Sequence, residues 1–258
     1  MPSRKRLAVA ALVVLVVAGV AVGVFGRSLP ESDARAVAIA DRTANATTNV
    51  TKYTFDVRGR AVARAKGEER RATYDGRGAF NRTTRRYFLR LTLDGDEETR
   101  YLRGHTAYRP CPFSRYVNVE NASYAVSLPE NRSWTTYTLL GGQRRLYDVS
   151  HLYYRGTTTI GGERTHELLV VPNQRKLRAF TRGVPSEGDP NRNLQNVSAT
   201  LYVSTETSLP RRIVVERTRG TLFGPTLRSR IVYDVTYGAT TVPRPDATVA
   251  SEDACPEP

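Results

Sequence analysis

Hydrophobic and polar residues follow three successive patterns along the chain. An unbroken apolar run of 19 residues, 7–25, comes first. Residues 34–44 then show a helical pattern, and Ser32 and Asp33 stand where residues that cap a helix are expected. From Thr51 onward apolar and polar residues alternate with a period of two, which is typical of strands that bury one face. The order predicts a membrane segment, a helix and then a sheet domain.

The clearest strands are predicted at residues 53–57, 85–93 and 227–237, where large apolar side chains occupy every second position. If such strands form one curved sheet, their apolar faces line its inner side, either as a ligand cavity or as a solid core. These candidate lining residues are Tyr53, Phe55, Val57, Tyr87, Leu89, Leu91, Leu93, Ile231, Tyr233 and Val235.

Weaker alternation predicts the remaining strands, and Gly- and Pro-rich stretches separate them. The further strands are expected at 99–103, 147–156, 165–171, 197–204 and 211–219, with short helices at 134–140 and 174–180 and a loop at 181–193. Together they predict an α+β fold with about eight to ten antiparallel strands. A sheet with one apolar face needs a cover, which we expect the helices to supply.

The apolar run at residues 7–25 is predicted to be an uncleaved membrane anchor. At about 1.5 Å per residue it spans roughly 28 Å, close to the ~30 Å hydrocarbon core of a bilayer. Signal peptides usually carry a shorter apolar stretch before a small-x-small cleavage site, and cleavage is the alternative. Basic residues stay in the cytoplasm, so residues 1–6 are expected there, followed by the anchor, a linker at 26–32 and a single extracellular domain at 33–258.

N-glycosylation sequons are frequent, which agrees with this topology. Six of the ten asparagines lie in Asn-x-Ser/Thr, where chance in a Thr-rich chain would give roughly one or two. For any single sequon, chance in a Thr-rich chain is the alternative explanation. The candidates are Asn45, Asn49, Asn81, Asn121, Asn131 and Asn196.

The two cysteines point to the same compartment. Cys111 and Cys255 are far apart in sequence and have no histidine nearby at metal-ligand spacing. In an oxidising environment a disulfide is the simplest interpretation, and it would tie the C-terminal tail to the middle of the domain. Two unpaired thiols are the alternative.

The chain is strongly basic, with a net charge of +14, and 35 of its 39 basic residues are arginines. This bias, with abundant Ala, Val and Thr, is typical of a GC-rich genome, and the sequons favour an archaeal surface protein. Arg–Tyr neighbours such as Arg100-Tyr101 resemble the composition of single-strand nucleic-acid binders. Strands with tyrosine facing a core and arginine facing solvent also explain them. Since the compartment and the scattered charge disfavour nucleic acid, anionic lipid headgroups or acidic glycans are the expected partners.

Motifs for catalysis, metals and cofactors are not found. His105, His151 and His166 are too far apart for a local metal motif, and the sequence has no phosphate-binding glycine loop or nucleophile elbow. We therefore expect no enzyme activity, metal or cofactor. Gly19 and Gly23 form a G-x-x-x-G pattern that would suit a homodimer of anchors, although small residues are common in membrane helices anyway.

The order of the elements resembles the LolA/LppX-like superfamily of envelope lipid-binding proteins. The points of likeness are a helix that leads into residues 53–55, the hairpin at 101–108, the segment 157–171, and the strand, turn and Leu-Pro sequence at 201–212. The resemblance covers roughly residues 34–243. It implies a half-barrel of antiparallel strands around an apolar cavity closed by helices. No binding residue is carried over, because no position-specific motif matches.

The resemblance and the topology together suggest a function. An anchored protein cannot carry cargo across a wide gap, so we expect it to bind a lipid or other apolar ligand, either to sense it or to hand it over locally. The alternative is a structural or interaction glycoprotein of the envelope, with a filled core and a protein partner.

Overall fold

The computed structural model describes residues 30–65, 67–93, 96–110, 122–131, 133–173, 194–220, 226–243 and 247–249. Within these residues twelve strands form one sheet, in the order β12-β6-β5-β4-β3-β2-β1-β11-β10-β9-β8-β7. Eleven of them pair antiparallel, and β12 pairs parallel to β6. The two end strands of this order do not pair with each other, so the sheet is open.

The elements follow the chain in this order: α2 (Ala34–Thr48), β1 (Lys52–Ala65), β2 (Glu68–Asn81), β3 (Arg86–Leu93), β4 (Asp96–Arg103), β5 (Thr106–Pro110), β6 (Ala122–Ser127), the 3-10 helix η2 (Trp134–Tyr137), α3 (Gln143–Asp148), β7 (Ser150–Ile160), β8 (Glu163–Pro172), β9 (Leu194–Ser204), β10 (Pro210–Gly220), β11 (Thr226–Tyr237) and β12 (Ala247–Val249).

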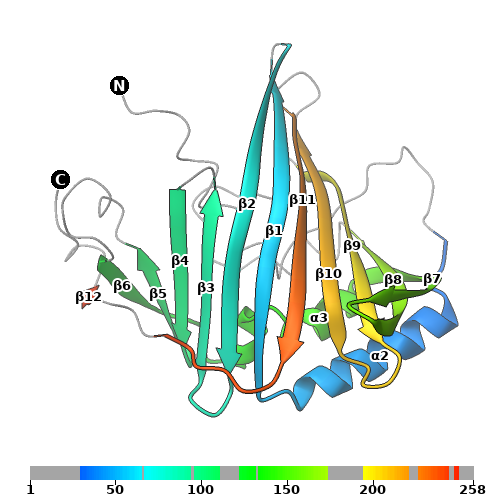
Figure 1. Cartoon of the computed structure of the whole chain (residues 1–258), viewed down its shortest axis with the longest axis horizontal. Helices are drawn as coiled ribbons and strands as arrows, with labels where there is room; N and C mark the ends of the chain where they lie inside the picture. Colours follow the sequence, from blue (N-terminus) through cyan, green and yellow to red (C-terminus); the bar gives the residue numbers. More distant parts are fainter. Residues whose placement is uncertain are drawn as a thin grey trace.

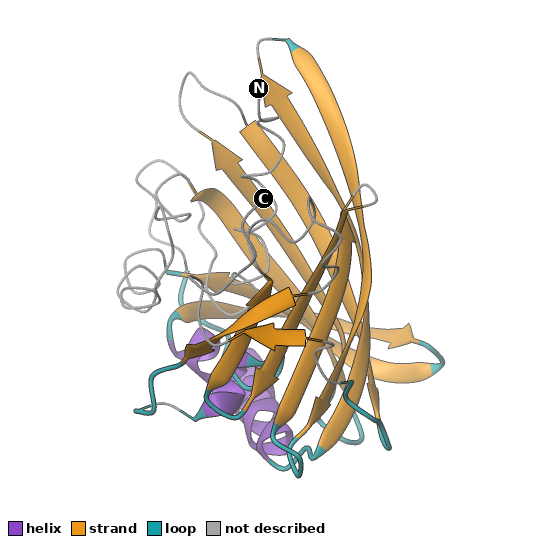
Figure 2. Ribbon diagram, turned by 90° about the vertical axis from the view of Figure 1, so that its left-hand side faces the viewer, coloured by secondary structure: helices purple, strands orange, loops and turns teal. Residues whose placement is uncertain are grey.

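The sheet bends into an open trough, and the helices lie against its concave side at one end (Figures 1 and 2). We call the side that faces the helices the inner face and the other the outer face. The predicted curved antiparallel sheet with helices on its concave face is confirmed for the described residues. The strands outnumber the eight to ten expected.

Alternation of large apolar residues explains why the central strands form. In β1, Tyr53, Phe55 and Val57 are all 2% exposed or less, while Asp56 and Arg58 between and beside them face solvent. The same alternation runs through β11, where Ile231, Tyr233 and Val235 are buried. Each strand therefore offers one apolar face, and antiparallel pairing brings these faces together.

Helix α2 covers the end of the sheet formed by β7, β8 and β9. Its apolar stripe, which includes Ile39 and Ala40, packs against Leu152, Leu168 and Leu201. Helix α3 lies beside it, and Tyr147 of α3 belongs to the same cluster. A helix this amphipathic is stabilised mainly by that packing.

The expected helix cap at the start of α2 has a different role. Neither Ser32 nor Asp33 makes a side-chain bond to the first turn. Instead Ser32 Oγ accepts a hydrogen bond from the Leu152 amide at 3.1 Å, and Asp33 Oδ2 accepts one from the Tyr154 amide at 2.8 Å. These two side chains accept hydrogen bonds from backbone amides of β7, which is an end strand of the sheet and has no neighbouring strand among the described residues on that side to pair with those amides.

Several elements differ from those expected from sequence. Strand β2, helix α3 and strands β6 and β12 were not predicted. Residues 134–140 form only the four-residue 3-10 helix η2, and the strand expected from residue 147 begins at Ser150, because residues 143–148 are helical. The short helix expected at 174–180 and the loop at 181–193 lie outside the described residues.

The expected anchor at residues 7–25 also lies outside the described residues, as do Gly19, Gly23 and both cysteines. Searched over the described ranges, the structure has no helix long and apolar enough to cross a membrane. The anchor, the linker, the disulfide and the dimer contact remain predictions.

Candidate ligand-binding face

Strand register gathers the predicted lining residues on the inner face. Phe55 lies opposite Val235 on one side and Gly78 on the other, and Gly78 in turn lies opposite Leu89. Nine of the ten predicted residues belong to a single buried cluster: Tyr53, Phe55, Val57, Tyr87, Leu89, Leu91, Ile231, Tyr233 and Val235. The tenth, Leu93, lies opposite Tyr74 on the same face, although its side chain is outside what the structure describes.

Aromatic rings close the end of this face nearest the helices. Tyr53 stacks on Phe80 at 4.8 Å between centroids, and Phe80 stacks on Trp134 of η2 at 5.4 Å. The amide of Leu140 donates a 3.4 Å hydrogen bond to the Tyr53 hydroxyl. Burial raises the pKa of Tyr53, so the hydroxyl stays neutral at physiological pH. This end is a packed core.

Two inner-face glycines of β2 leave space that atoms of the neighbouring strands occupy. A Cβ on Gly78 would stand 2.1 Å from Cζ of Phe55, so the ring occupies the space that any side chain would take. A Cβ on Gly76 would stand 2.3 Å from the carbonyl oxygen of Arg90. Phe55 is held in that space by Tyr87 and Tyr233, whose ring centroids lie 5.9 and 6.2 Å away.

Two arginines also lie on the inner face, and sequence reasoning did not single them out. Arg100 of β4 lies opposite Leu89, and Arg217 of β10 lies opposite Ser229. Arg217 Nε donates a 2.8 Å hydrogen bond to Ser229 Oγ. The interpretation that tyrosines of Arg–Tyr pairs face the core and arginines face solvent is wrong for Arg100, because its neighbour Tyr101 is buried on the outer face.

Close to α2, the inner face carries a histidine among cations. The ring of His166 lies 5.8 Å from that of Tyr154, and the guanidinium of Arg35 lies 3.9 Å from the Tyr154 ring centre. Partial burial lowers the pKa of His166, and the charges of Arg35, Arg42 and Arg164 lower it further. His166 is therefore uncharged at neutral pH.

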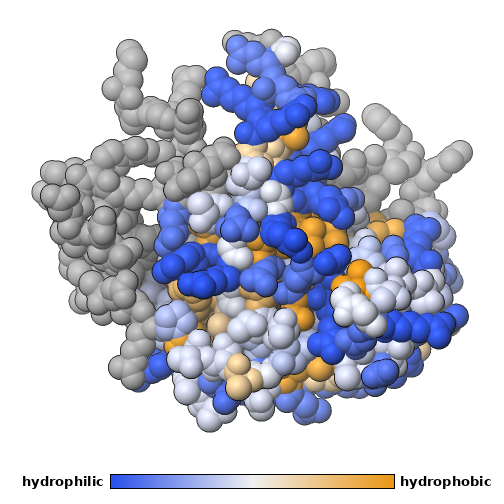
Figure 3. Space-filling view, viewed as in Figure 1, coloured by the Kyte–Doolittle hydropathy of each residue, from blue (hydrophilic) through white to orange (hydrophobic). Residues whose placement is uncertain are grey.

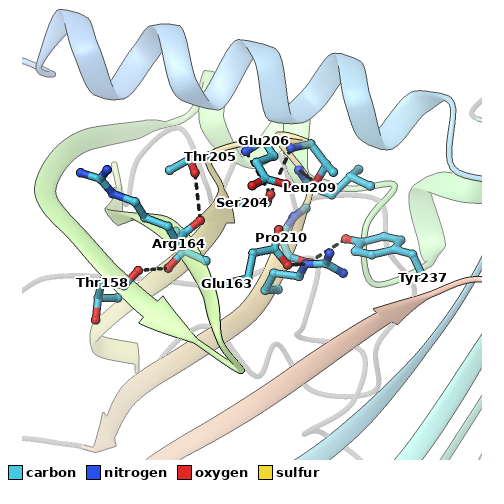
Figure 4. A network of polar contacts seen from close by, with 12 residues as sticks. Thr158, Glu163, Arg164, Ser204, Thr205, Glu206, Leu209, Pro210 and Tyr237 are labelled. Carbon is cyan, nitrogen blue, oxygen red and sulfur yellow. Dashed lines mark hydrogen bonds and ion pairs between the residues drawn. The ribbon is translucent and has the colours of Figure 1, made fainter.

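A polar network holds the β8, β9 and β10 ends in place (Figure 4). Ser204 Oγ accepts hydrogen bonds from the amides of Glu206 and Thr207, which fixes the turn between β9 and β10. Glu163 pairs with Arg211. Burial raises the pKa of Glu163, but hydrogen bonds from Ser204 and Arg211 outweigh burial, and the net pKa lies below its usual value. The network positions strands and places no reactive group in the open.

Hydrophilic residues cover much of the outer face, with pale and apolar residues between them (Figure 3). Asp234 accepts hydrogen bonds from both Arg58 and Arg212. Nearer the helix end, Val242 covers Phe88 and Tyr101, which gives this face a small apolar cluster of its own. The outer face therefore carries ion pairs and a second, minor core.

The sequons lie in different surroundings. Asn45 and Asn49 on α2 and its C-terminal cap are exposed, as is Asn131. Asn81 is 7% exposed, and its Oδ1 accepts a 3.1 Å hydrogen bond from the Thr84 amide. Asn196 lies in β9 without a described side chain, and Asn121 lies outside the described residues.

Over the described part of the chain, no group of three or more His, Cys, Asp or Glu side chains is placed to hold a metal ion. The expectation that the protein uses no metal or cofactor and catalyses no reaction stays a prediction. What the described inner face provides is a buried apolar cluster, with Arg100, Arg217 and His166 at other inner positions.

Comparison with known proteins gives similarity at the level of fold. No family model and no curated protein matches the chain. Among solved structures, the lipoprotein LppX from Mycobacterium tuberculosis is 14% identical with a TM-score of 0.47, and the match covers 82% of this chain and 100% of LppX. LprF from Mycobacterium bovis is 12% identical with a TM-score of 0.45, covering 84% and 99% of the two chains.

A third similar structure is an outer membrane lipoprotein-sorting protein domain from Vibrio parahaemolyticus, which is 7% identical with a TM-score of 0.32. The match covers 80% of this chain and 94% of that domain. With TM-scores below 0.5, these likenesses do not say what the chain binds. An archaeal origin stays a prediction. The chain is similar in fold to structures of the LolA/LppX-like kind that its sequence resembles.

Proposed function

We propose that this protein is a membrane-anchored, extracellular binding protein for a lipid or another apolar ligand, which it senses or hands over locally. One observation carries the proposal: nine apolar or aromatic side chains from β1, β3 and β11 line a single concave face. The described helices lie at only one end of that face (Figure 2). An acyl chain is the kind of ligand that an extended apolar face of this form suits.

The apolar segment at residues 7–25 and the sequons support an anchored position outside the cytoplasm. In that position the ligand would come from the adjacent membrane, and a protein partner would receive either the ligand or the signal.

The alternative is an envelope glycoprotein with a filled core, and one observation favours it. The rings of Tyr53, Phe80 and Trp134 stack in series, and the rest of the cluster is less than 9% exposed. Such packing is typical of a core that holds no cargo.

A matched pair of bulky substitutions separates a container from a filled core. Ile231→Phe enlarges a side chain on the inner face, whereas Val232→Phe enlarges its neighbour on the outer face. Full-length protein isolated mildly from its host would be extracted with organic solvent, and the lipid bound per chain counted by mass spectrometry. A container predicts lipid on the unmodified protein and on Val232→Phe, with less on Ile231→Phe and little change in its stability.

A filled core predicts no bound lipid in any of the three proteins. It also predicts that Ile231→Phe loses about 1–3 kcal/mol of stability through overpacking, while Val232→Phe is tolerated. That result would reject the binding proposal in favour of the glycoprotein.

A further inference from the structure

The long end strand of the sheet, β7, is covered along only half of its outer edge by described residues. It pairs with β8 on one side and ends the strand order, whereas the opposite end of the sheet is the three-residue strand β12. Ser32 and Asp33 accept hydrogen bonds from the β7 amides of Leu152 and Tyr154. Past Tyr154 no described element lies along the strand. We call residues 156–160 the free edge.

The backbone of the free edge directs two residues away from the sheet. The carbonyl oxygen of Thr158 accepts a 3.1 Å hydrogen bond from the Thr165 hydroxyl of β8, so Thr158 faces β8. Successive residues of a strand send their backbone groups to opposite sides. The N–H and C=O groups of Thr157 and Thr159 therefore point outward, and both residues are exposed. They offer two donors and two acceptors for which the described residues supply no partner.

The free edge lacks the features that usually prevent strands from pairing across an open sheet edge. Such edges commonly carry charged side chains, proline or a bulge. A bulge interrupts β7 between Tyr154 and Gly156, before the free edge begins. Residues 156–160 read Gly-Thr-Thr-Thr-Ile, with no charge and no proline. Because threonine and isoleucine also favour strands, this edge can accept another strand.

The free edge is complementary to itself. If two copies pair antiparallel about a twofold axis at Thr158, Thr157 of each copy lies opposite Thr159 of the other, and their outward groups form four backbone hydrogen bonds. The uncharged side chains bring no like charges together. Because this axis is perpendicular to the sheet, both copies turn the same face of the sheet to the same side.

The N-terminal segment leaves the domain beside this strand. The Tyr153 hydroxyl donates a 2.8 Å hydrogen bond to the carbonyl oxygen of Pro30, which fixes Pro30 at β7. Pro30 is five residues beyond Phe25, the end of the apolar run, and the chain between them reaches at most about 18 Å. With that run as the anchor, β7 of every copy lies near the membrane, and the twofold axis sends both anchors to the same side. Tethering in one bilayer also raises the effective concentration of the edges.

We propose that β7 is a self-association edge: residues 156–160 of two membrane-anchored copies pair antiparallel about Thr158 and join the two sheets into one. The inference rests on the anchored position in the proposed function and adds a partner, a second copy of this chain. Four backbone hydrogen bonds make a small interface compared with the ~1,200–2,000 Å² that stable pairs bury. The pairing is therefore expected in the membrane and not between copies free in dilute solution.

A cysteine placed on the twofold axis tests the pairing. In this register Thr158 faces its own copy as a non-hydrogen-bonded pair with Cα atoms about 4.5 Å apart, which a disulfide can bridge. The matched control for Thr158→Cys is Thr236→Cys, an exposed position on β11, which has a neighbouring strand on each side. The unmodified protein shows what Cys111 and Cys255 contribute. Full-length protein is oxidised in its cell membranes, and the covalent dimer is measured before and after reduction.

The pairing predicts roughly tenfold more dimer for Thr158→Cys than for Thr236→Cys, because only position 158 faces its own copy. Adding Thr159→Pro to Thr158→Cys should lower the dimer to the level of the control, since proline removes an outward N–H. That N–H does not bond to β8, so the fold should persist, and a denaturant titration followed by Trp134 fluorescence checks this. Thr159→Lys leaves the backbone intact and should also lower the dimer, because charge protects an edge.

Equal dimer at positions 158 and 236 would overturn the pairing while the anchored binding protein stands. A dimer at position 158 that neither Thr159→Pro nor Thr159→Lys lowers would overturn it as well. A disulfide between position 158 and a different protein, identified by mass spectrometry, would overturn the second copy as the occupant of the edge. Protein that alkaline carbonate washes from the membranes would contradict the anchor, so the membrane position in the proposed function and this inference would fail together.

Discussion

Gly78→Ala is expected to destabilise the protein because the new methyl group would collide with Phe55. An ideal Cβ at position 78 stands 2.1, 2.4 and 2.7 Å from three ring carbons of Phe55, far inside the 3.5–4 Å of normal contact. The ring has little freedom to move, because Tyr53, Tyr87 and Tyr233 surround it with centroids 5.9–6.2 Å away.

The expected cost follows from two opposing effects. Overpacking a core costs about 1–3 kcal/mol, and the reduced freedom of the unfolded chain returns about 0.4–1 kcal/mol. The net loss should be roughly 0.5–2 kcal/mol, which for a domain of this size lowers Tm by about 1–8 °C. In a Phe55→Leu background the ring atoms that collide are gone. There Gly78→Ala should be neutral or stabilising.

Trp134 is the sole tryptophan and stacks on Phe80 in the same cluster, so its fluorescence reports unfolding directly. Denaturant titrations of the four proteins in the cycle give the coupling between the two positions, expected at about 1–3 kcal/mol. If Gly78→Ala has the same effect in both backgrounds, Phe55 does not occupy the space over Gly78 and the description of the inner face is wrong.

Three further predictions test separate parts of the structure. Tyr53→Phe removes the acceptor for the Leu140 amide and should lower stability by about 0.5–1.5 kcal/mol in the same titration; no change would mean that this hydrogen bond is absent. The pKa of His166 is lowered on folding, so its contribution to stability is present above the unfolded value of about 6.5 and is lost as pH falls through the folded pKa. A His166→Gln variant should show a smaller acid loss in Tm scans from pH 8 to 5, and an identical loss would refute the shift. Glycopeptide mass spectrometry of native protein should find sugar on exposed Asn45 but not on buried Asn81, and the reverse would contradict the described surface.

Sequence predicted the strands whose inner residues are large. Tyr53, Phe55 and Val57 alternate with polar residues in β1, and Tyr233 and Val235 do so in β11. Because nearly all of the apolar side chains in these strands point one way, period and burial coincide, and both the strands and the candidate lining followed from the pattern.

Strand β2 could not be predicted in this way because its partners determine its inner face. It begins with the charged residues 68–71 and places Gly76 and Gly78 at inner positions, where the backbone of β3 and the ring of Phe55 fill the space. Without the pairing, this segment reads as a polar, glycine-containing loop. Helix α3 has six residues, too few for a helical period to show.

The inner position of Arg100 was hidden for a related reason. In residues 99–103 alternation alone suggests that Tyr101 faces the core and Arg100 faces solvent. The register of β3 with β4 reverses this, placing Arg100 opposite Leu89 and Tyr101 opposite Phe88 on the outer face. Val242 covers Tyr101 there, so both sides of β4 contain buried residues. Side-chain period shows that two faces exist but not which one is inner.

Photo-crosslinking in living cells tests the binding proposal most directly. A benzophenone amino acid would replace either Tyr87 on the inner face or its neighbour Phe88 on the outer face, both of which are aromatic and 8% exposed. After irradiation, mass spectrometry of the intact protein should show an added lipid mass with the probe at position 87 and none at position 88. Lipid adducts at neither position, or equally at both, would contradict a ligand held on the inner face.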